Sequence, residues 1–339
     1  MNSFQRFGQQ MAGQWVDRSA NFDIFMAFAA HRIGEPLRNY YTDYRVLCAS
    51  NYAVAEAFDV DLVQAISDPY RETHDFGAKI EFPEDELPVC REPLLKTAAD
   101  LAKLVPPDPR SGERMSDRLR AIERFRRDVS GERPIMGWVE GALAEAADLR
   151  GVQKLLMDLI QRPAWVHELL ECCTEVAIHF AVAQVEAGAD IIGLGDAIAS
   201  QVSPRMYKEF ALPYERRIFD AVRDAGGIAR LHICGDITHL LPLIPQAGPE
   251  IVDLDWMVDI PKAIAALPSE IYVCGNVDPV AVMLSATPDE VYEAATRCLE
   301  QGTGRLIAGA GCEIPDGTPD ENLHAQAQAI ADYGAPSAG

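Results

Sequence analysis

From residue 134 onward, short apolar stretches alternate regularly with longer segments of helical periodicity. Strands are predicted at residues 134–139, 189–195, 226–232, 251–254, 271–274 and 305–310. Helices are predicted between them, at residues 148–161, 163–188, 203–225 and 237–246, and a last helix from about residue 319 to residue 333. Strands that alternate with helices form a parallel sheet. So many units in one uninterrupted run favour an α/β fold of the closed (β/α)8 type, a TIM barrel, over an open doubly wound sheet.

The segment that precedes this run has a different character. Residues 1–75 are rich in alanine and helical patterns, and we expect them to form an N-terminal helical extension. The barrel is expected to occupy residues 76–334, with residues 335–339 as a disordered tail. The stretch at residues 75–88 contains GAKIEF, which is compatible with one strand of a hairpin.

Charge and cysteine usage narrow the functional classes. The formal net charge of −22 disfavours binding to nucleic acid or to an anionic membrane, because both are polyanions. The sequence shows no secretory leader and no apolar run of membrane-spanning length. The eight cysteines are scattered through 339 residues, unlike a dense disulfide framework. We therefore expect a cytoplasmic protein with reduced thiols.

One glycine pattern suggests a nucleotide but is incomplete. Gly193 and Gly195 form a G-x-G at the end of a predicted strand, without the third glycine of a dinucleotide-binding fingerprint. A Rossmann interpretation is therefore weak.

Three residues with zinc-ligand chemistry follow two of the predicted strands. His232 and Cys234 come at the end of the strand at residues 226–232, and Cys312 follows the strand at residues 305–310. Nitrogen and sulfur are the donors that zinc prefers, and three protein ligands leave a fourth position open. In a (β/α)8 barrel the carboxyl ends of the strands carry the chemistry. If these strand ends meet, the pattern predicts a catalytic zinc site.

Several carboxylates are predicted to face the same end of the barrel. Glu140 follows the strand at residues 134–139 and is the candidate for a fourth ligand or a substrate contact, with a solvated loop carboxylate as the alternative. Asp196 ends the next strand and is expected to bind substrate or to hydrogen-bond His232. Asp253 and Asp255 alternate along one strand and so point the same way; one is expected to contact substrate, unless it caps the next helix.

Several segments carry a resemblance to a known family. HICGD (residues 232–236), VCGNVDP (273–279) and GCEIPDGTPDENLHA (311–325) resemble the uroporphyrinogen decarboxylase superfamily, and more narrowly its zinc-dependent corrinoid methyltransferase branch. GWVEGALAEAADLRG (137–151) and GDAIASQVSPRMYKEFALPY (195–214) are similar to the same branch. The likeness extends from about residue 40 to residue 330. It implies a (β/α)8 barrel with an N-terminal helical extension.

The resemblance also implies roles for particular residues. The matching His232, Cys234 and Cys312 would hold zinc, and Asn276 in the CGNVDP turn would contact substrate. Tyr44 is expected to line the barrel mouth, with simple packing as the alternative. The enzyme would move a methyl group between a small substrate and the cobalamin of a separate corrinoid protein docked over the mouth. The direction stays open, between demethylation of a methoxylated aromatic or methylamine-type donor and methylation of a thiol acceptor.

Two alternatives remain. Decarboxylases of this superfamily carry an arginine-rich R-Q-A-G-R motif, and the comparable residues 31–45 (HRIGEPLRNYYTDYR) have no such motif. This departure argues against decarboxylation of a tetrapyrrole. The other alternative is a structural zinc in a binding component of a corrinoid system.

Overall fold

The computed structural model describes residues 1–334 and has a parallel sheet at its centre. Its seven strands are, in spatial order, β1 (Val63–Gln64), β4 (Ile135–Glu140), β5 (Ile191–Gly195), β6 (Ile228–His232), β7 (Ile251–Leu254), β8 (Tyr272–Gly275) and β9 (Leu306–Ile307). Every neighbouring pair is parallel. The predicted α/β barrel of the TIM type is confirmed.

The gap between the first and last strands is filled by residues 20–24. Asn21 forms a parallel bridge with Ala308, which directly follows β9. The backbone N–H of Asp61, just before β1, donates a hydrogen bond to the Asn21 carbonyl at 2.9 Å. The ring is thus completed by an extended piece of the N-terminal segment. Both this piece and β1 lie inside residues 1–75, the range expected to form a helical extension.

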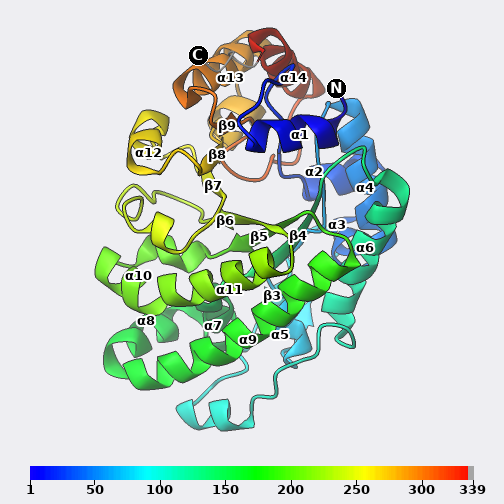
Figure 1. Ribbon diagram of the computed structural model, residues 1–339. Coiled ribbons are helices and arrows are strands. Elements are labelled where there is room, and N and C mark those ends of the chain that lie inside the picture. Colours follow the sequence, from blue (N-terminus) through cyan, green and yellow to red (C-terminus); the bar gives the residue numbers. More distant parts are fainter. Residues whose placement is uncertain (335–339) are drawn as a thin grey trace.

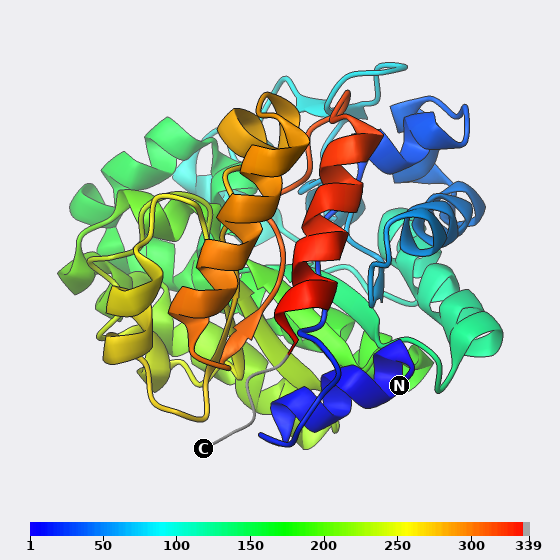
Figure 2. The same cartoon turned by 90° about the horizontal axis from the view of Figure 1, so that it is seen from above.

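Helices surround the sheet (Figure 1). They are α1 (Ser3–Met11), α2 (Ala27–Arg32), α3 (Leu37–Thr42), α4 (Tyr44–Ala57), α5 (Arg71–Asp75), α6 (Glu113–Val129), α7 (Ala142–Arg150), α8 (Val152–Gln161), α9 (Pro163–Ala187), α10 (Pro204–Phe210), α11 (Leu212–Asp224), α12 (Ile260–Ala266), α13 (Pro288–Gly302) and α14 (Asp320–Tyr333). Short helical turns occur at Ala98–Lys103, Ala197–Gln201, Ile244–Gln246 and Pro279–Leu284. Figure 2 shows α13 and α14 side by side, with α1 near the end of α14.

The strands separate two apolar regions, because successive side chains of a strand point to opposite faces. One set points into the barrel and includes Met136, Trp138, Ile191, Ile251, Tyr272 and Ile307. The other set packs beneath the helices and includes Ile135, Val139, Ile192, Leu231, Val252 and Val273. Burial on both faces explains why these strands read as continuous apolar runs.

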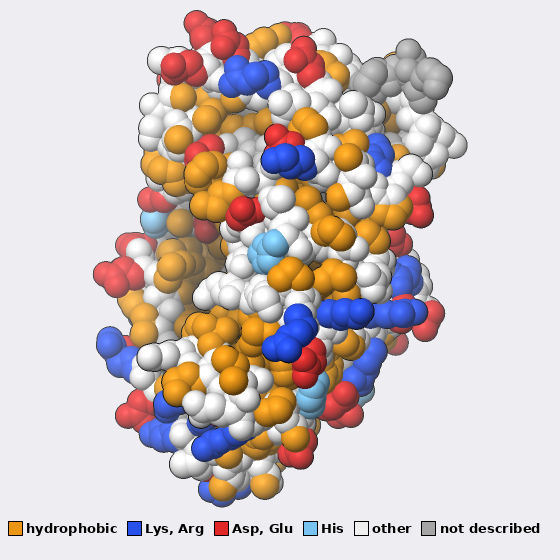
Figure 3. All heavy atoms as spheres, turned by 90° about the vertical axis from the view of Figure 1, so that its left-hand side faces the viewer, with side chains coloured by type: hydrophobic (Ala, Val, Ile, Leu, Met, Phe, Trp, Pro, Cys, Tyr) orange, Lys and Arg blue, Asp and Glu red, His pale blue; other side chains and the backbone are white. Residues whose placement is uncertain are grey.

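Apolar and charged side chains share the surface on one face of the molecule (Figure 3). On the face that carries α8, α10 and α12, apolar side chains are interspersed with charged ones of both signs (Figure 3). Among residues 1–334, no helix is both long and apolar enough to cross a bilayer.

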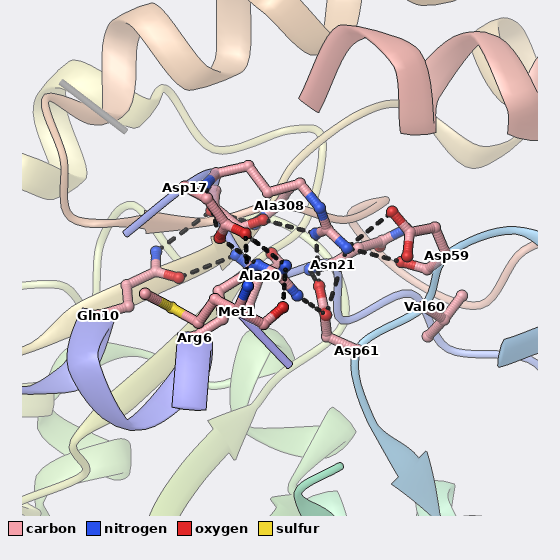
Figure 4. A network of polar contacts seen from close by, with 12 residues as sticks. Met1, Arg6, Gln10, Asp17, Ala20, Asn21, Asp59, Val60, Asp61 and Ala308 are labelled. Atoms are coloured by element: carbon pink, nitrogen blue, oxygen red, sulfur yellow. Dashed lines mark hydrogen bonds and ion pairs between the residues drawn. The ribbon is translucent and has the colours of Figure 1, made fainter. Parts of the chain in front are cut away.

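A buried ion network links residues 20–24, the closing segment of the barrel, to the sheet (Figure 4). Asp61 is completely buried, and its two carboxylate oxygens lie 2.6 Å from Arg6 Nη1 and 2.6 Å from Arg18 Nη1. The same carboxylate accepts the backbone N–H of Asn21 at 2.8 Å. One side chain therefore joins α1, the closing segment and the start of β1.

We expect Asp61→Asn to lower the free energy of unfolding by about 3–5 kcal/mol, because removing one partner of a buried ion pair leaves uncompensated charge. Asp59→Asn is the matched control. Asp59 also contacts Arg18, at 2.8 Å, but its side chain is 61% exposed, and exposed pairs contribute about 0–1 kcal/mol. Urea unfolding of both variants measures the difference, and equal effects would contradict the role assigned to Asp61.

The helices differ in detail from the prediction, whereas the hairpin agrees with it. The helix expected at residues 237–246 is wrong: this stretch forms turns and ends in the short turn Ile244–Gln246. The helix expected at residues 203–225 divides at Ala211 into α10 and α11. The hairpin strand is confirmed, with β2 (Ile80–Glu81) antiparallel to β3 (Val89–Cys90). The predicted tail at residues 335–339 lies outside the described residues.

Candidate metal centre

The structure brings the three predicted zinc ligands together. His232 is the last residue of β6, Cys234 lies two residues beyond it, and Cys312 lies in the loop after β9. His232 Nε2 is 3.2 Å from Cys234 Sγ and 3.9 Å from Cys312 Sγ. One donor atom from each residue lies within 4.8 Å of the other two.

These separations suit a tetrahedral zinc ion. Bonds of about 2.3 Å to sulfur and about 2.0–2.1 Å to nitrogen place a nitrogen and a sulfur ligand roughly 3.6 Å apart and two sulfurs roughly 3.8 Å apart. The nitrogen–sulfur distances of 3.2 and 3.9 Å bracket that value. The donor set and its spacing therefore fit zinc without a large rearrangement.

Asp253 orients the histidine ring. Its Oδ2 lies 2.8 Å from His232 Nδ1, and its Oδ1 lies 2.8 Å from Arg230 Nε. The side chain of Asp253 was predicted to contact substrate. In the structure both of its oxygens are engaged by neighbouring side chains and the residue is buried.

The pKa values of the three donor residues are shifted in different directions. Burial alone would lower the pKa of His232, but its hydrogen bonds with Asp253 and Cys234 raise it well above the usual value. The hydrogen bond with Cys234 lowers the pKa of Cys312 to about 4, against the opposing effect of burial. That same contact, together with burial, raises the pKa of Cys234. Because zinc binds thiolates and a neutral imidazole, a bound ion would displace the protons that remain on the donors.

A hydrogen bond and close backbone packing fix the two loops that carry Cys234 and Cys312. The Gly235 N–H donates to Asp255 Oδ2 at 2.7 Å, which fixes the loop that carries Cys234. A Cβ at Gly311 would lie 2.5 Å from the Trp256 nitrogen, so only glycine lets the Cys312 loop approach the end of β7 so closely. Asp255 therefore braces the loop of one cysteine, and the backbone at its position packs against the loop of the other.

Asn276 braces the same region. Its Nδ2 donates to the carbonyls of Asp255 at 2.9 Å and Val258 at 2.8 Å. Asn276, a predicted substrate contact, thus directs its amide nitrogen toward the backbone after β7. Its substrate role stays a prediction.

Glu140 lies in the same row of the sheet as His232. The residue pairs in register with Gly195 on β5, and Gly195 pairs with His232 on β6. A Cβ at Gly195 would lie 3.1 Å from the Trp138 ring and 3.4 Å from Glu140 Oε2, so both side chains lie close to this glycine. The Trp138 ring, one layer below Glu140, lies with its centroid 5.7 Å from that of the His232 ring. Glu140 is therefore placed at the level of the metal ligands.

The Glu140 carboxylate is buried and paired. Its Oε1 lies 2.8 Å from Arg71 Nη2, and the residue is 8% exposed. Burial raises the pKa of Glu140 to about 7, although Arg71 favours the ionised form. A carboxyl group that titrates near neutrality can both accept and donate a proton.

Asp196 contacts His232 through the backbone. The Asp196 N–H donates to the His232 carbonyl at 3.0 Å, while its fully buried carboxylate packs against Gly141 at the start of α7. Burial raises the pKa of Asp196 well above the usual range. The predicted hydrogen bond to the imidazole is not among its contacts, and a role in substrate binding stays a prediction.

Tyr44 lies at the start of α4, facing α6. Its N–H donates to Asp117 at 3.2 Å, and the guanidinium groups of Arg45 and Arg120 lie 4.8 and 5.9 Å from its ring centroid. These contacts favour the packing interpretation of Tyr44 over the barrel-mouth one.

A buried cluster of arginines and carboxylates, centred on the segment after β1, was not predicted from the sequence. Arg71 contacts Glu72 and Glu140, and Arg114 forms an ion pair with Asp68 at 2.5 Å. All five residues are buried. The signal was present in SDPYRETH (residues 67–74), where several charged residues directly follow an apolar stretch. Their position beyond a strand end would have pointed to the same face of the barrel.

Comparisons with known proteins agree with this architecture. A methyltransferase from Methanosarcina mazei has the same fold, with a TM-score of 0.89 at 24% identity over 98% of this chain and 99% of that one. The methylcobamide:CoM methyltransferase MtbA of Methanosarcina mazei is 33% identical over 217 residues, a match that spans only 63% of each protein. A uroporphyrinogen decarboxylase of Prochlorococcus marinus is 29% identical over 78% of this chain and 76% of its own length.

The family assignment rests on nearly the whole chain. The profile of the Uroporphyrinogen decarboxylase (URO-D) family matches residues 5–333. This range includes the closing segment, the arginine–carboxylate cluster and all three zinc-type donors. The chain therefore belongs to the uroporphyrinogen decarboxylase (URO-D) family.

Proposed function

We propose that this protein is a zinc-dependent methyltransferase that moves a methyl group between a small substrate and the cobalamin of a separate corrinoid protein. The observation that carries the proposal is the convergence of His232, Cys234 and Cys312, with nitrogen–sulfur distances of 3.2 and 3.9 Å. The 33% identity to a methylcobamide:CoM methyltransferase supports it.

The residues around the centre suit this chemistry. When bound, zinc would act as a Lewis acid on a substrate oxygen or amine, or would hold a substrate thiol in its deprotonated form. Asp253 holds the imidazole, and the two cysteines supply the negative charge that balances a dication. Glu140, level with His232, accepts or delivers the proton that accompanies transfer. The substrate therefore meets its methyl-transfer partner above the row that joins Glu140 to His232.

The charge balance at the mouth disfavours the decarboxylase alternative. A tetrapyrrole with several carboxylates needs cationic side chains that are free to bind them. Arg71, Arg114 and Arg118 are instead buried and paired with Glu140, Asp68 and Asp117, respectively. The same mouth carries further buried carboxylates at Glu72 and Asp255. A polyanionic substrate would meet repulsion here.

The rim beside the metal centre offers an apolar contact for the corrinoid partner. Trp256 and Met257, in the loop after β7, are 49% and 51% exposed. This loop is fixed from beneath by Asn276 and packs against Gly311. An aromatic residue and a methionine on a rigid loop are typical of protein–protein contacts. We propose that the corrinoid protein docks here and brings its cobalt over the barrel mouth.

The test combines metal analysis with a transfer assay. We expect about one zinc per chain by elemental mass spectrometry and zinc-dependent demethylation of methylcobalamin, or methylation of cob(I)alamin, in a screen of thiols, methoxylated aromatics and methylamines. Release of carbon dioxide from a porphyrinogen without zinc would establish the decarboxylase alternative. Zinc that resists exchange, with four protein ligands in its X-ray absorption spectrum and no methyl transfer, would establish a structural metal.

A further inference from the structure

A charged side chain lies inside the barrel directly beneath the metal centre. Arg230 occupies an inward position of β6, one layer below His232, and is 1% exposed. Its guanidinium lies near Met136 Sδ at 3.3 Å and Cys274 Sγ at 3.5 Å, and 5.6 Å from the centroid of the Phe22 ring. These neighbours are weak acceptors at best, so the buried charge depends on a carboxylate for its compensation.

Asp253 is the carboxylate paired with Arg230, with a weaker electrostatic contribution from the buried Asp23, and it also contacts His232. Neighbouring registers place it level with His232, because Arg230 pairs with Ile251 across β6 and β7. Its Oδ1 accepts from Arg230 Nε and its Oδ2 lies 2.8 Å from His232 Nδ1. The residue is 4% exposed. Arginine, aspartate and histidine thus form a continuous chain from the barrel interior to the metal centre.

The contacts from Arg230 through Asp253 to His232 determine which imidazole nitrogen faces the thiols. A carboxylate that pairs with arginine is ionised and can only accept hydrogen bonds. His232 Nδ1 must therefore carry the proton in the contact with Asp253. The other nitrogen, Nε2, is directed toward Cys234 and Cys312. Fixing the ring in this way costs the metal site no reorganisation when an ion binds.

We propose that Arg230 and Asp253 are positioning residues, which hold His232 with Nε2 toward the metal and Nδ1–H away from it. This inference rests on the zinc centre of the proposed function. Asp253 acts directly on the imidazole, whereas Arg230 acts only through Asp253. The function of the pair is accordingly separate from any contact with substrate.

The first test is Asp253→Asn, which keeps the shape of the side chain and removes its charge. The asparagine can donate to Nδ1, which permits the wrong tautomer and the loss of the Nε2 ligand. Removing such a supporting partner weakens metal binding about 10–100-fold. We expect the Kd for zinc, measured by competition with a chromophoric chelator, to rise by that factor.

Spectroscopy distinguishes positioning from simple stability. In zinc-loaded protein with 15N-labelled histidine, we expect His232 to carry its proton on Nδ1 in the wild type and to lose that single form in Asp253→Asn. Asp278→Asn is the matched control, because Asp278 follows the neighbouring strand and its carboxylate accepts from Val280 and Ala281 at the start of its own helical turn. The control should leave the Kd and the histidine signal unchanged.

A double variant keeps the test valid if the single one folds poorly. Arg230→Met alone removes the arginine that compensates the buried charge of Asp253 and should lower the Tm, whereas Arg230→Met with Asp253→Asn removes both charges together. We expect the double variant to fold and to show the same loss of zinc affinity as Asp253→Asn. A wild-type Kd and a wild-type histidine signal in Asp253→Asn or in the double variant would overturn the proposal. A wild-type protein that binds no zinc would instead overturn the proposed function itself.

Discussion

Cys312→Ser is expected to abolish zinc binding at stoichiometric metal and to eliminate methyl transfer. The substitution removes one of three protein donors, and a serine hydroxyl does not supply the thiolate that zinc prefers. Loss of an outer partner already costs about 10–100-fold in metal affinity, so loss of a ligand should cost at least about 100-fold. Metal content after gel filtration and the rate of methylcobalamin demethylation measure the two effects.

The fold should survive this change. Cys312 lies in a loop after β9 and is only partly buried, so its replacement disrupts no core packing. Cys172→Ser is the matched control, because Cys172 is also partly buried but lies on α9. Full zinc content and full activity in Cys312→Ser would rule out the catalytic metal, while unfolding of Cys312→Ser alone would indicate a structural one.

Glu140→Gln is expected to slow methyl transfer by about 10²–10⁴-fold while zinc content stays at the wild-type value. The carboxylate lies level with His232, separated from it by Gly195. An amide in its place cannot accept or deliver the proton. Single-turnover rates with saturating substrate, together with metal analysis, check the prediction.

The pH profile should carry the signature of this residue. Because burial raises the pKa of Glu140 to about 7, the wild-type rate should change near neutral pH. A rate that falls as pH rises through 7 means that Glu140 delivers a proton, as the departure of an alkoxide requires. A rate that rises means that it accepts one, as methylation of a thiol requires. The sign therefore reports the direction of transfer, and the change should vanish in Glu140→Gln.

A second buried glutamate provides the control for that profile. Burial raises the pKa of Glu215 to about 7 as well, but its carboxylate accepts from the Tyr207 hydroxyl, between α10 and α11. Glu215→Gln should therefore keep the inflection near pH 7. If Glu215→Gln loses it and Glu140→Gln keeps it, the assignment of the proton transfer to Glu140 is wrong.

The barrel and the ligand trio were accessible from local patterns. Apolar strands separated by helices predict a parallel ring, and the donor chemistry of His232, Cys234 and Cys312 suits zinc provided that the two strand ends meet. Both inferences use properties of single segments. Parallel strands also bring their carboxyl ends to one face, so the trio could be expected there.

The closure of the ring was not accessible in the same way. Residues 20–24 pair with the backbone near Ala308 and Asp61, contacts that join positions far apart in the chain. Nothing in the apolar pattern of so short a piece distinguishes an extended closing segment from a loop. The ion network of Asp61 with Arg6 and Arg18, which fixes it, is likewise formed only on folding.

The sequence by itself determined the fold class and the donor types of the candidate metal centre, because strand periodicity and ligand chemistry are properties of single short segments. The tertiary structure alone decided the partners of each carboxylate. Asp253 contacts His232 and Arg230, Glu140 contacts Arg71, and Asn276 contacts the backbone after β7. A buried polar group takes whichever partner the packing brings within hydrogen-bond distance, and that choice depends on the register of neighbouring strands.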